Sequence, residues 1–298
     1  MRRPATPGST GARGKNMNEM VAEQPWLWAG LGAYFVATLL AMWGVSPRLT
    51  GDDVVLRQRH QRWVLGFIVL GVLLLTVAIA ARWVRIGHGP WISLFELLMS
   101  QMWSLGLIFA VLYWRLPGLR PSAVVVLPVM WILGSWVLML EPDVSHFPAT
   151  YYNAWKWSHV GLGKVFLALL LAGVGLGGVM ILRRTRQGRL WFRAMPPDAV
   201  IDRLAWRLMM LALVFDSLML IAGAVWAQDA WGRYWAWDAL ETSAFLTWLF
   251  LAIGLHVRLS YKVPPWVSGA IIIGIFAMAF GTYFGTPYLS PSAHKGVV

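Results

Sequence analysis

The stretch that decides the fold runs from Trp63 to Val84 and reads WVLGFIVLGVLLLTVAIAARWV. Arg82 is its one charged residue, and almost everything else in it is apolar. As an α-helix this stretch is about 33 Å long, which matches the roughly 30 Å of hydrocarbon in a lipid bilayer. Only helices and closed barrels satisfy their backbone hydrogen bonds in lipid, and a barrel strand needs only about ten residues. The stretch therefore predicts a membrane-spanning helix.

Similar apolar stretches recur along the chain, and together they predict an all-α, polytopic membrane bundle of about eight transmembrane helices. The composition agrees, because 58% of the residues are hydrophobic and only 13% are charged, which is not typical of a soluble domain. We expect a polar segment with a disorder-like composition at residues 1–25 and a single membrane domain at residues 26–298. The expected spans are residues 26–45, 63–84, 94–114, 122–140, 159–182, 205–226, 244–260 and 266–286.

The charges in the connecting loops predict the orientation of the bundle. An even number of spans places both termini on one side. Fifteen of the 25 Lys and Arg residues, from Arg48 to Lys262, fall in the loops of the other side, and a basic excess marks the cytoplasmic side. Both termini are therefore expected on the outer, periplasmic side. Because orientation explains the basic excess, no nucleic acid partner is expected.

The chain contains no cysteine. It therefore has no disulfide, no thiolate metal site and no thiol nucleophile of its own. Any thiol chemistry at this protein must use the cysteines of a partner.

The segment 226–245 contains the most informative loop, Trp231-Gly-Arg-Tyr-Trp-Ala-Trp-Asp-Ala-Leu-Glu241. Tryptophans are common at membrane interfaces, but an interfacial belt does not require three of them in one turn beside polar residues. A flat aromatic platform with hydrogen-bonding groups suits a large planar ligand. Arg233 suits a ligand carboxylate such as a heme propionate, although Asp229 offers it a simpler partner. The candidate binding residues of the loop are Trp231, Arg233, Trp235, Trp237, Asp238 and Glu241.

Histidines supply the candidate metal ligands. Histidine is the commonest axial ligand of heme iron, and two facing imidazoles hold the iron from both sides. His159 begins the fifth span and His294 follows the last, so both are expected on the same side as the tryptophan-rich loop, as is His88. His256 lies inside a span, where an ionisable group is costly and usually functional. The simpler interpretations are capping or snorkelling for the histidines at helix ends, and a hydrogen bond to a neighbouring helix for His256.

The run from Ala224 to Thr242 resembles the tryptophan-rich (WWD) signature of the heme-handling proteins of cytochrome c maturation, most closely the CcsA (ResC) branch. The resemblance covers roughly residues 60–294. The chain departs from that family at Leu75, where many relatives carry a histidine, and at Lys164, where they usually have no lysine. Further matching motifs are Gly87-His88-Gly-Pro90 followed by Glu96, Ser158-His159-Val160, Thr247-Trp248 and Leu255-His256-Val-Arg258.

The resemblance implies a component of a cytochrome c heme lyase (synthase). Such a protein brings heme b (iron protoporphyrin IX) to the outer face and presents it to the CxxCH thiols of an apocytochrome c. His159 and His294 match the family's two outward axial ligands, and His256 matches its intramembrane histidine. The resemblance also implies a membrane partner of the CcsB (ResB) type and a multi-pass location in the bacterial inner (cytoplasmic) membrane. The absence of cysteine agrees, because the reacting thiols belong to the cytochrome.

Two other functions fit the same residues. One is a heme b-bearing membrane subunit of a respiratory complex that transfers electrons between quinone and an external multiheme cytochrome c. The other is a transporter without a cofactor, in which the histidines relay protons. A permanently bound heme indicates the electron carrier, whereas a substoichiometric heme that leaves on an apocytochrome indicates the lyase. The absence of heme absorbance indicates the transporter.

Overall fold

The structure is a computed structural model that describes residues 22–45, 54–89, 91–144 and 153–286. In this part of the chain every regular element is helical, and eight helical segments are long and apolar enough to cross a membrane. This confirms the predicted all-α membrane bundle. The eight segments are α2 (Gln24–Gly44), α3 (Val54–Ile86), α4 (Leu94–Arg115), η1 with α5 (Pro117–Ser122 and Ala123–Val137), α6 (Ala154–Leu182), α8 (Asp198–Trp231), α9 (Ala239–Ser260) and α10 with η3 (Pro265–Phe280 and Gly281–Gly285).

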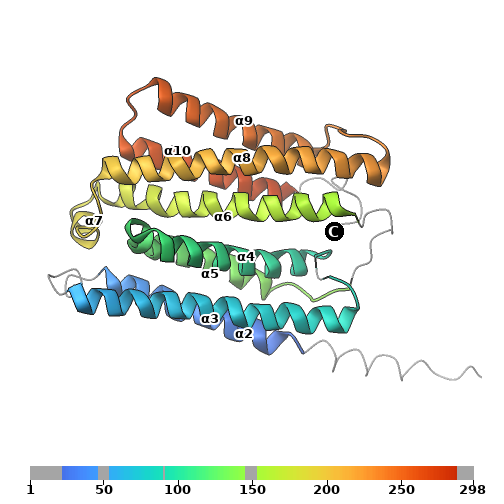
Figure 1. Ribbon diagram of the computed structural model, residues 1–298, viewed down its shortest axis with the longest axis horizontal. Helices are drawn as coiled ribbons and strands as arrows, with labels where there is room; N and C mark the ends of the chain where they lie inside the picture. Colours follow the sequence, from blue (N-terminus) through green and yellow to red (C-terminus); the bar gives the residue numbers. More distant parts are fainter. Residues whose placement is uncertain (1–21, 46–53, 90, 145–152, 287–298) are drawn as a thin grey trace, which may run out of the picture.

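The long helices run side by side, so the bundle has two distinct ends (Figure 1). We name one of them the tryptophan end, because α8 stops there at Trp231 and the tryptophan-rich loop leads into α9. The other is the arginine end, which carries η1 and the short helix α7 (Arg186–Trp191). The first described helix begins, and the last ends, at the tryptophan end. Which side of the membrane this end faces remains a prediction.

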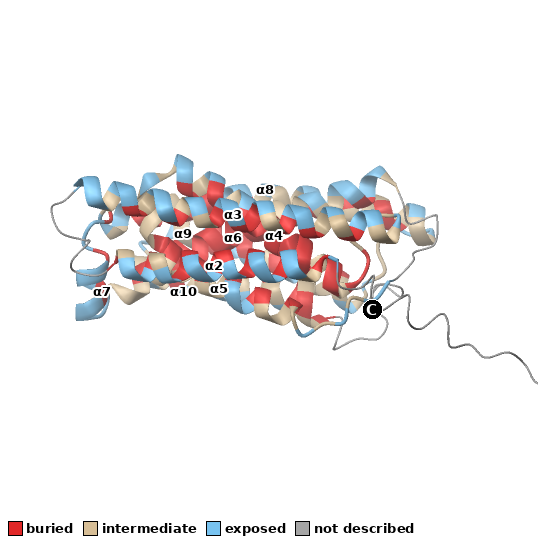
Figure 2. Ribbon diagram, turned by 90° about the horizontal axis from the view of Figure 1, so that it is seen from below, coloured by how far each residue is buried: buried red, intermediate tan, exposed pale blue. Residues whose placement is uncertain are grey.

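Helix α6 occupies the centre of the bundle (Figure 2) and packs against α8, α10, α4 and α5. Its glycines allow these neighbours to come close. A Cβ added at Gly177 would lie 3.1 Å from the Cα of Gly269 in α10, and one added at Gly178 would lie 2.9 Å from Cγ1 of Val125 in α5. Small residues serve helix packing in this way inside membranes. These two glycines are therefore explained by helix contacts.

The side chains that face away from the bundle are also apolar. Large hydrophobic residues are exposed on several helices, for example Leu73 on α3, Ile132 on α5 and Phe250 on α9. So much exposed apolar surface is unusual for a protein in water, but it needs no partner when lipid chains surround it. The surface therefore agrees with a multi-pass protein whose environment is the lipid bilayer.

A buried ion network closes the tryptophan end. Arg82, the one charge in the stretch that predicted α3, is fully buried. Its guanidinium pairs with Glu96 at 2.7 Å and with Glu23 at 2.9 Å, and both carboxylates are fully buried as well. It also donates to the carbonyl oxygens of Pro142, at 3.2 Å, and Asp143, at 2.6 Å. The network connects α3 and α4 to the residue before α2 and to the segment after α5.

Candidate functional site

A cavity of about 230 Å³ lies at the tryptophan end, between α4, α6, α8, α9, η3 and the loop that joins α8 to α9. We name it the tryptophan-end cavity. Most of its lining is apolar, which suits a ligand with a large apolar surface and a few polar groups. Its more polar lining residues are Gln101, Lys156, His159, Lys164, Tyr234, Trp235, Glu241, Thr282 and Tyr283.

His159, the first predicted ligand, lies in α6 and lines this cavity. Its Nδ1 lies 2.9 Å from the backbone carbonyl oxygen of Met219 in α8. Because a carbonyl oxygen can only accept, Nδ1 carries the hydrogen, and a neutral ring then has its lone pair on Nε2. Metal-ligating histidines are commonly oriented by such a bond from the second ring nitrogen. The ring also stacks on Trp226, with centroids 6.1 Å apart and planes 23° from parallel.

Gly223 makes room for this histidine. A Cβ at that position of α8 would lie 2.7 Å from Nδ1 and 2.9 Å from Cε1 of His159. Both distances are shorter than ordinary van der Waals contact, so any larger residue would push the ring away from the Met219 carbonyl. The close approach of α8 to α6 at Gly223 therefore positions the candidate ligand.

The acidic residues of the tryptophan-rich loop support its backbone. Asp238 caps α9, because its carboxylate accepts a hydrogen bond of 2.8 Å from the backbone N–H of Glu241. Glu241 is buried, and its own carboxylate accepts from the backbone N–H of Ala236 at 2.6 Å. An N-cap of this kind contributes about 1 kcal/mol. Of the two carboxylates, only that of Glu241 also lines the cavity.

The three tryptophans of the loop have different surroundings. Trp235 is half-buried and lines the cavity, and its indole Nε1 has no hydrogen-bond partner among the described residues. Trp231 packs edge-on against Trp226, with centroids 5.1 Å apart, and so supports the wall behind His159. Trp237 is 68% exposed, has a φ of 57° and does not line the cavity. Only Trp235 is therefore placed to touch a ligand there.

Arg233, predicted to bind a ligand carboxylate, is exposed and does not line the cavity. It forms no ion pair with any residue that the structure describes. The carboxylate of Asp229, its alternative partner, instead accepts a hydrogen bond of 2.9 Å from Asn153.

Two lysines also line the cavity, although the sequence did not predict them as site residues. Lys156 is 3% exposed, and its ammonium lies 5.2 Å from the centre of the Trp157 ring. Lys164 donates to the hydroxyl of Ser100 in α4 at 2.9 Å. A signal was present for Lys156, because residues three apart share one face of a helix and Lys156 lies three residues before His159. Charges inside a membrane span are costly and usually functional.

The remaining predicted histidines do not join His159 within the described part of the chain. His88 is half-buried at the tryptophan end, with Nδ1 3.2 Å from the carbonyl of Gly89, and it does not line the cavity. His256 is exposed on α9, nearer the arginine end. His294 lies outside the described residues. Among the described residues, no group of three or more His, Cys, Asp or Glu gathers as a metal site.

Together, the fold and the cavity define a multi-pass helical membrane protein with an aromatic, histidine-lined cavity at one end of its bundle. Comparison with known proteins identifies the family. Residues 91–294 match the sequence model described as Cytochrome C assembly protein. The chain therefore belongs to the cytochrome c assembly protein family.

Individual relatives agree with this placement. The chain is 30% identical over 301 residues to the cytochrome c biogenesis protein CcsA of Synechococcus sp. (strain RCC307), a match that covers 89% of this chain and 92% of the relative. It is 27% identical to CcsA of Prochlorococcus marinus (strain MIT 9312), over 76% of this chain and 82% of the relative. Among solved structures, cytochrome c heme lyase CcmF shares the fold, with a TM-score of 0.60 at 16% identity. That match covers 99% of this chain, which spans about half (54%) of the CcmF chain.

Proposed function

We propose that this protein works in cytochrome c maturation by holding heme in the tryptophan-end cavity, with His159 as an axial ligand. The observation that carries the proposal is the bond from His159 Nδ1 to the Met219 carbonyl, because it leaves the iron-binding lone pair on Nε2. Membership of the cytochrome c assembly family, and relatives that are named cytochrome c biogenesis proteins, support the role in maturation. The alternative of an electron-transfer subunit that uses quinone receives no support from these comparisons.

The residues that line the cavity fit heme b. Its apolar walls suit the two faces of a porphyrin, and the ammonium groups of Lys156 and Lys164 suit the two propionates. The indole N–H of Trp235 is a further donor. Because the chain has no cysteine, it cannot attach heme through thioether bonds of its own, which is why we propose the non-covalently held heme b.

We further propose that the tryptophan end faces the outside of the bacterial inner membrane. The support comes from charge, since the segment from Arg183 to Arg207 at the arginine end alone contains seven arginines. His294, which lies outside the described residues, is proposed as the second axial ligand, because it follows the last span and matches the ligand of the resembling family. His256 is proposed to have a weaker role in heme binding, as it does not line the cavity.

The contribution of the chain to heme attachment is positioning. Bound heme supplies the vinyl groups to which the CxxCH thiols of an apocytochrome c add. The lysines and His159 would hold the ligand in one orientation, and the tryptophans would exclude water from it. Correct positioning of reactants can supply about 7–11 kcal/mol of a barrier without an acid or base. An apocytochrome c and a CcsB-type membrane protein are the proposed partners.

A transfer assay on purified full-length protein, together with its CcsB-type partner, tests this function. We expect a Soret band with less than one heme per chain. Adding a CxxCH-containing apocytochrome should decrease this band while covalently attached heme appears on the cytochrome. Heme that remains at full occupancy and unaltered in the presence of the apocytochrome would contradict the proposal.

Replacing Gly223 with alanine should reduce heme binding without unfolding the protein. The added Cβ would lie 2.7 Å from His159 Nδ1, so the ring must leave the Met219 carbonyl. Loss of a hydrogen bond that orients a metal-binding histidine typically lowers metal affinity by roughly 10–100-fold. Heme content per chain is the measurement. Gly274→Ala is the matched control, because no atom lies within 4 Å of a Cβ added there; equal heme content in the two variants would refute the role of Gly223.

Lys164→Met should weaken heme binding by about ten- to a hundredfold, because a hydrogen bond to a charged group contributes roughly 1.5–3 kcal/mol. The protein itself should become no less stable, since a half-buried charge is removed from an apolar span. Titration of the apoprotein with heme measures the change. Lys262→Met is the control, as Lys262 is exposed at the arginine end, and equal affinities of both variants would contradict a propionate contact at Lys164.

A further inference from the structure

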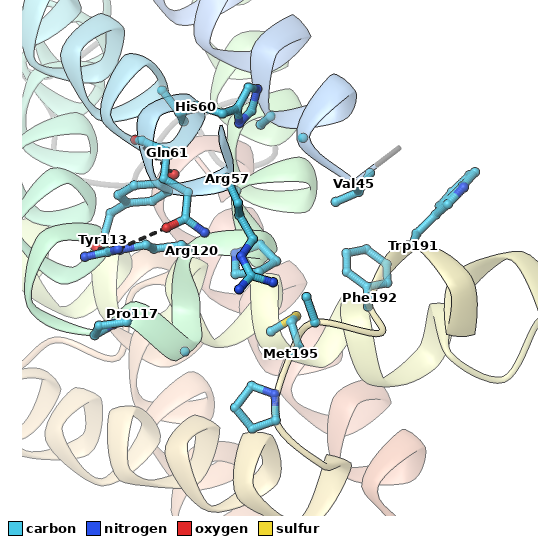
Figure 3. A pocket seen from close by; sticks show the side chains of 18 residues that line it. Val45, Arg57, His60, Gln61, Tyr113, Pro117, Arg120, Trp191, Phe192 and Met195 are labelled. Carbon is cyan, nitrogen blue, oxygen red and sulfur yellow. Dashed lines mark hydrogen bonds between the residues drawn. The ribbon is translucent and has the colours of Figure 1, made fainter. Parts of the chain in front are cut away.

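A second cavity, of about 280 Å³, lies at the arginine end. Figure 3 shows it between the start of α3, η1 and the segment that follows α7. Val45, after α2, completes the wall. We name it the arginine-end cavity. It shares no lining residue with the tryptophan-end cavity and lies at the opposite end of the bundle, so heme binding at His159 does not explain it.

Two cationic side chains line the arginine-end cavity and differ in their partners. Arg120 is fixed, because its guanidinium donates to Gln61 Oε1 at 3.0 Å and to the carbonyl oxygens of Tyr113, at 3.1 Å, and Trp114, at 3.3 Å. Arg57 extends into the cavity (Figure 3) and has no hydrogen bond or ion pair within the described part of the chain. No acidic residue belongs to the described lining. Among the described residues, the guanidinium of Arg57 therefore has no counter-charge, and it is placed to bind an anion.

A buried histidine adds a second polar group. His60 lies one helical turn after Arg57 in α3, lines the same cavity and is only 9% exposed. Its Nε2 has no hydrogen-bond partner among the described residues. A buried polar atom without a partner is destabilising, and a ligand hydroxyl that donates to Nε2 would remove this cost.

The rest of the wall is apolar. Val45, Val64, Phe192 and Met195 are all buried and line the cavity. A small soluble anion would leave this surface without a partner. Trp191, which is 39% exposed at the end of α7, is the kind of residue that lies at lipid headgroup level. The ligand that fits both parts of the wall has an anionic head and an apolar body.

We propose that the arginine-end cavity binds one anionic phospholipid from the adjacent leaflet. Arg57 holds the phosphate, a head-group hydroxyl donates to His60 Nε2, and the glycerol and the first acyl carbons lie against Phe192 and Met195. A guanidinium suits a phosphate especially well, because it donates two parallel hydrogen bonds. The lipid thereby connects α3 to the segment between α7 and α8.

Native mass spectrometry of the full-length protein, titrated in detergent with phosphatidylglycerol or phosphatidylcholine, tests the proposal. We expect one retained phosphatidylglycerol per chain and a clear preference over phosphatidylcholine. Arg57→Gln should weaken this binding by at least about tenfold, as expected for the loss of a charged hydrogen bond. Arg59→Gln is the matched control, because Arg59 lies two residues away in α3, is exposed and does not line the cavity. Should Arg57→Gln fail to fold, His60→Gln replaces it with the same expected direction.

Three results would overturn the proposal. The first is equal phosphatidylglycerol binding by the Arg57→Gln and Arg59→Gln variants. The second is displacement of the lipid by millimolar inorganic phosphate, which would indicate a site for a soluble anion. The third is loss of heme with unchanged lipid binding in Arg57→Gln, which would assign the cavity to heme. Unchanged heme content together with reduced phosphatidylglycerol binding supports the lipid site.

Discussion

Replacing His159 with alanine should remove most of the heme from the purified protein. The ring is held by the Met219 carbonyl and by Trp226 so that Nε2 has the lone pair, and no other histidine in the described part of the chain lines the tryptophan-end cavity. Loss of a residue that hydrogen-bonds to a metal ligand already lowers the affinity for the metal by roughly 10–100-fold. Loss of the ligand itself should therefore have at least that effect. The heme-to-protein ratio and the reduced absorbance spectrum measure it.

Two further measurements separate ligand loss from misfolding. Added imidazole should restore heme binding to His159→Ala, because it can occupy the space of the missing ring. His256→Ala, on the exposed face of α9, should lose much less heme. Unchanged heme content and band positions in His159→Ala would remove the assignment, and a larger heme loss in His256→Ala would reverse the ranking of the two histidines.

Arg82→Ala should cause the largest loss of stability. It would leave Glu96 buried without its counter-charge and Glu23 with Arg85 as its remaining partner, and it would remove the donors to the Pro142 and Asp143 carbonyls. Removing one partner of a buried ion pair lowers the free energy of unfolding by about 3–5 kcal/mol. We expect a low yield of folded protein and an early unfolding transition in a thermal scan of the detergent-solubilised chain.

A variant in which no buried carboxylate lacks a counter-charge tests whether the missing counter-charge causes this loss of stability. When Glu96→Gln is added to Arg82→Met, Glu23 still pairs with Arg85 and no carboxylate of the network lacks a counter-charge, so much of the stability should return. Arg59→Ala, which removes an exposed arginine of the same helix, is the control and should be nearly neutral. An unfolding midpoint of Arg82→Ala equal to that of Arg59→Ala would show that the network contributes nothing.

Sequence alone determined the helical membrane fold, because the length of an apolar stretch and the cost of unpaired backbone groups in lipid are local properties. The tryptophan-rich loop and His159 could also be selected as candidates from the sequence, because their neighbours along the chain form recognisable motifs. The ends of the helices were predicted less accurately than their number. Helix α8 extends several residues beyond the predicted span at both ends, and α7 was not predicted, since a short helix outside the membrane needs no long apolar stretch.

Only the tertiary structure decided which side chains meet. Trp235 lines the cavity while Trp237, two residues later, does not, because the loop backbone between α8 and α9 turns through a positive φ at Trp237. The contacts of His159 with Met219, and of Arg82 with Glu23, join residues about sixty positions apart. Such contacts depend on the rotation and depth at which neighbouring helices pack, and no periodicity within a single helix contains that information.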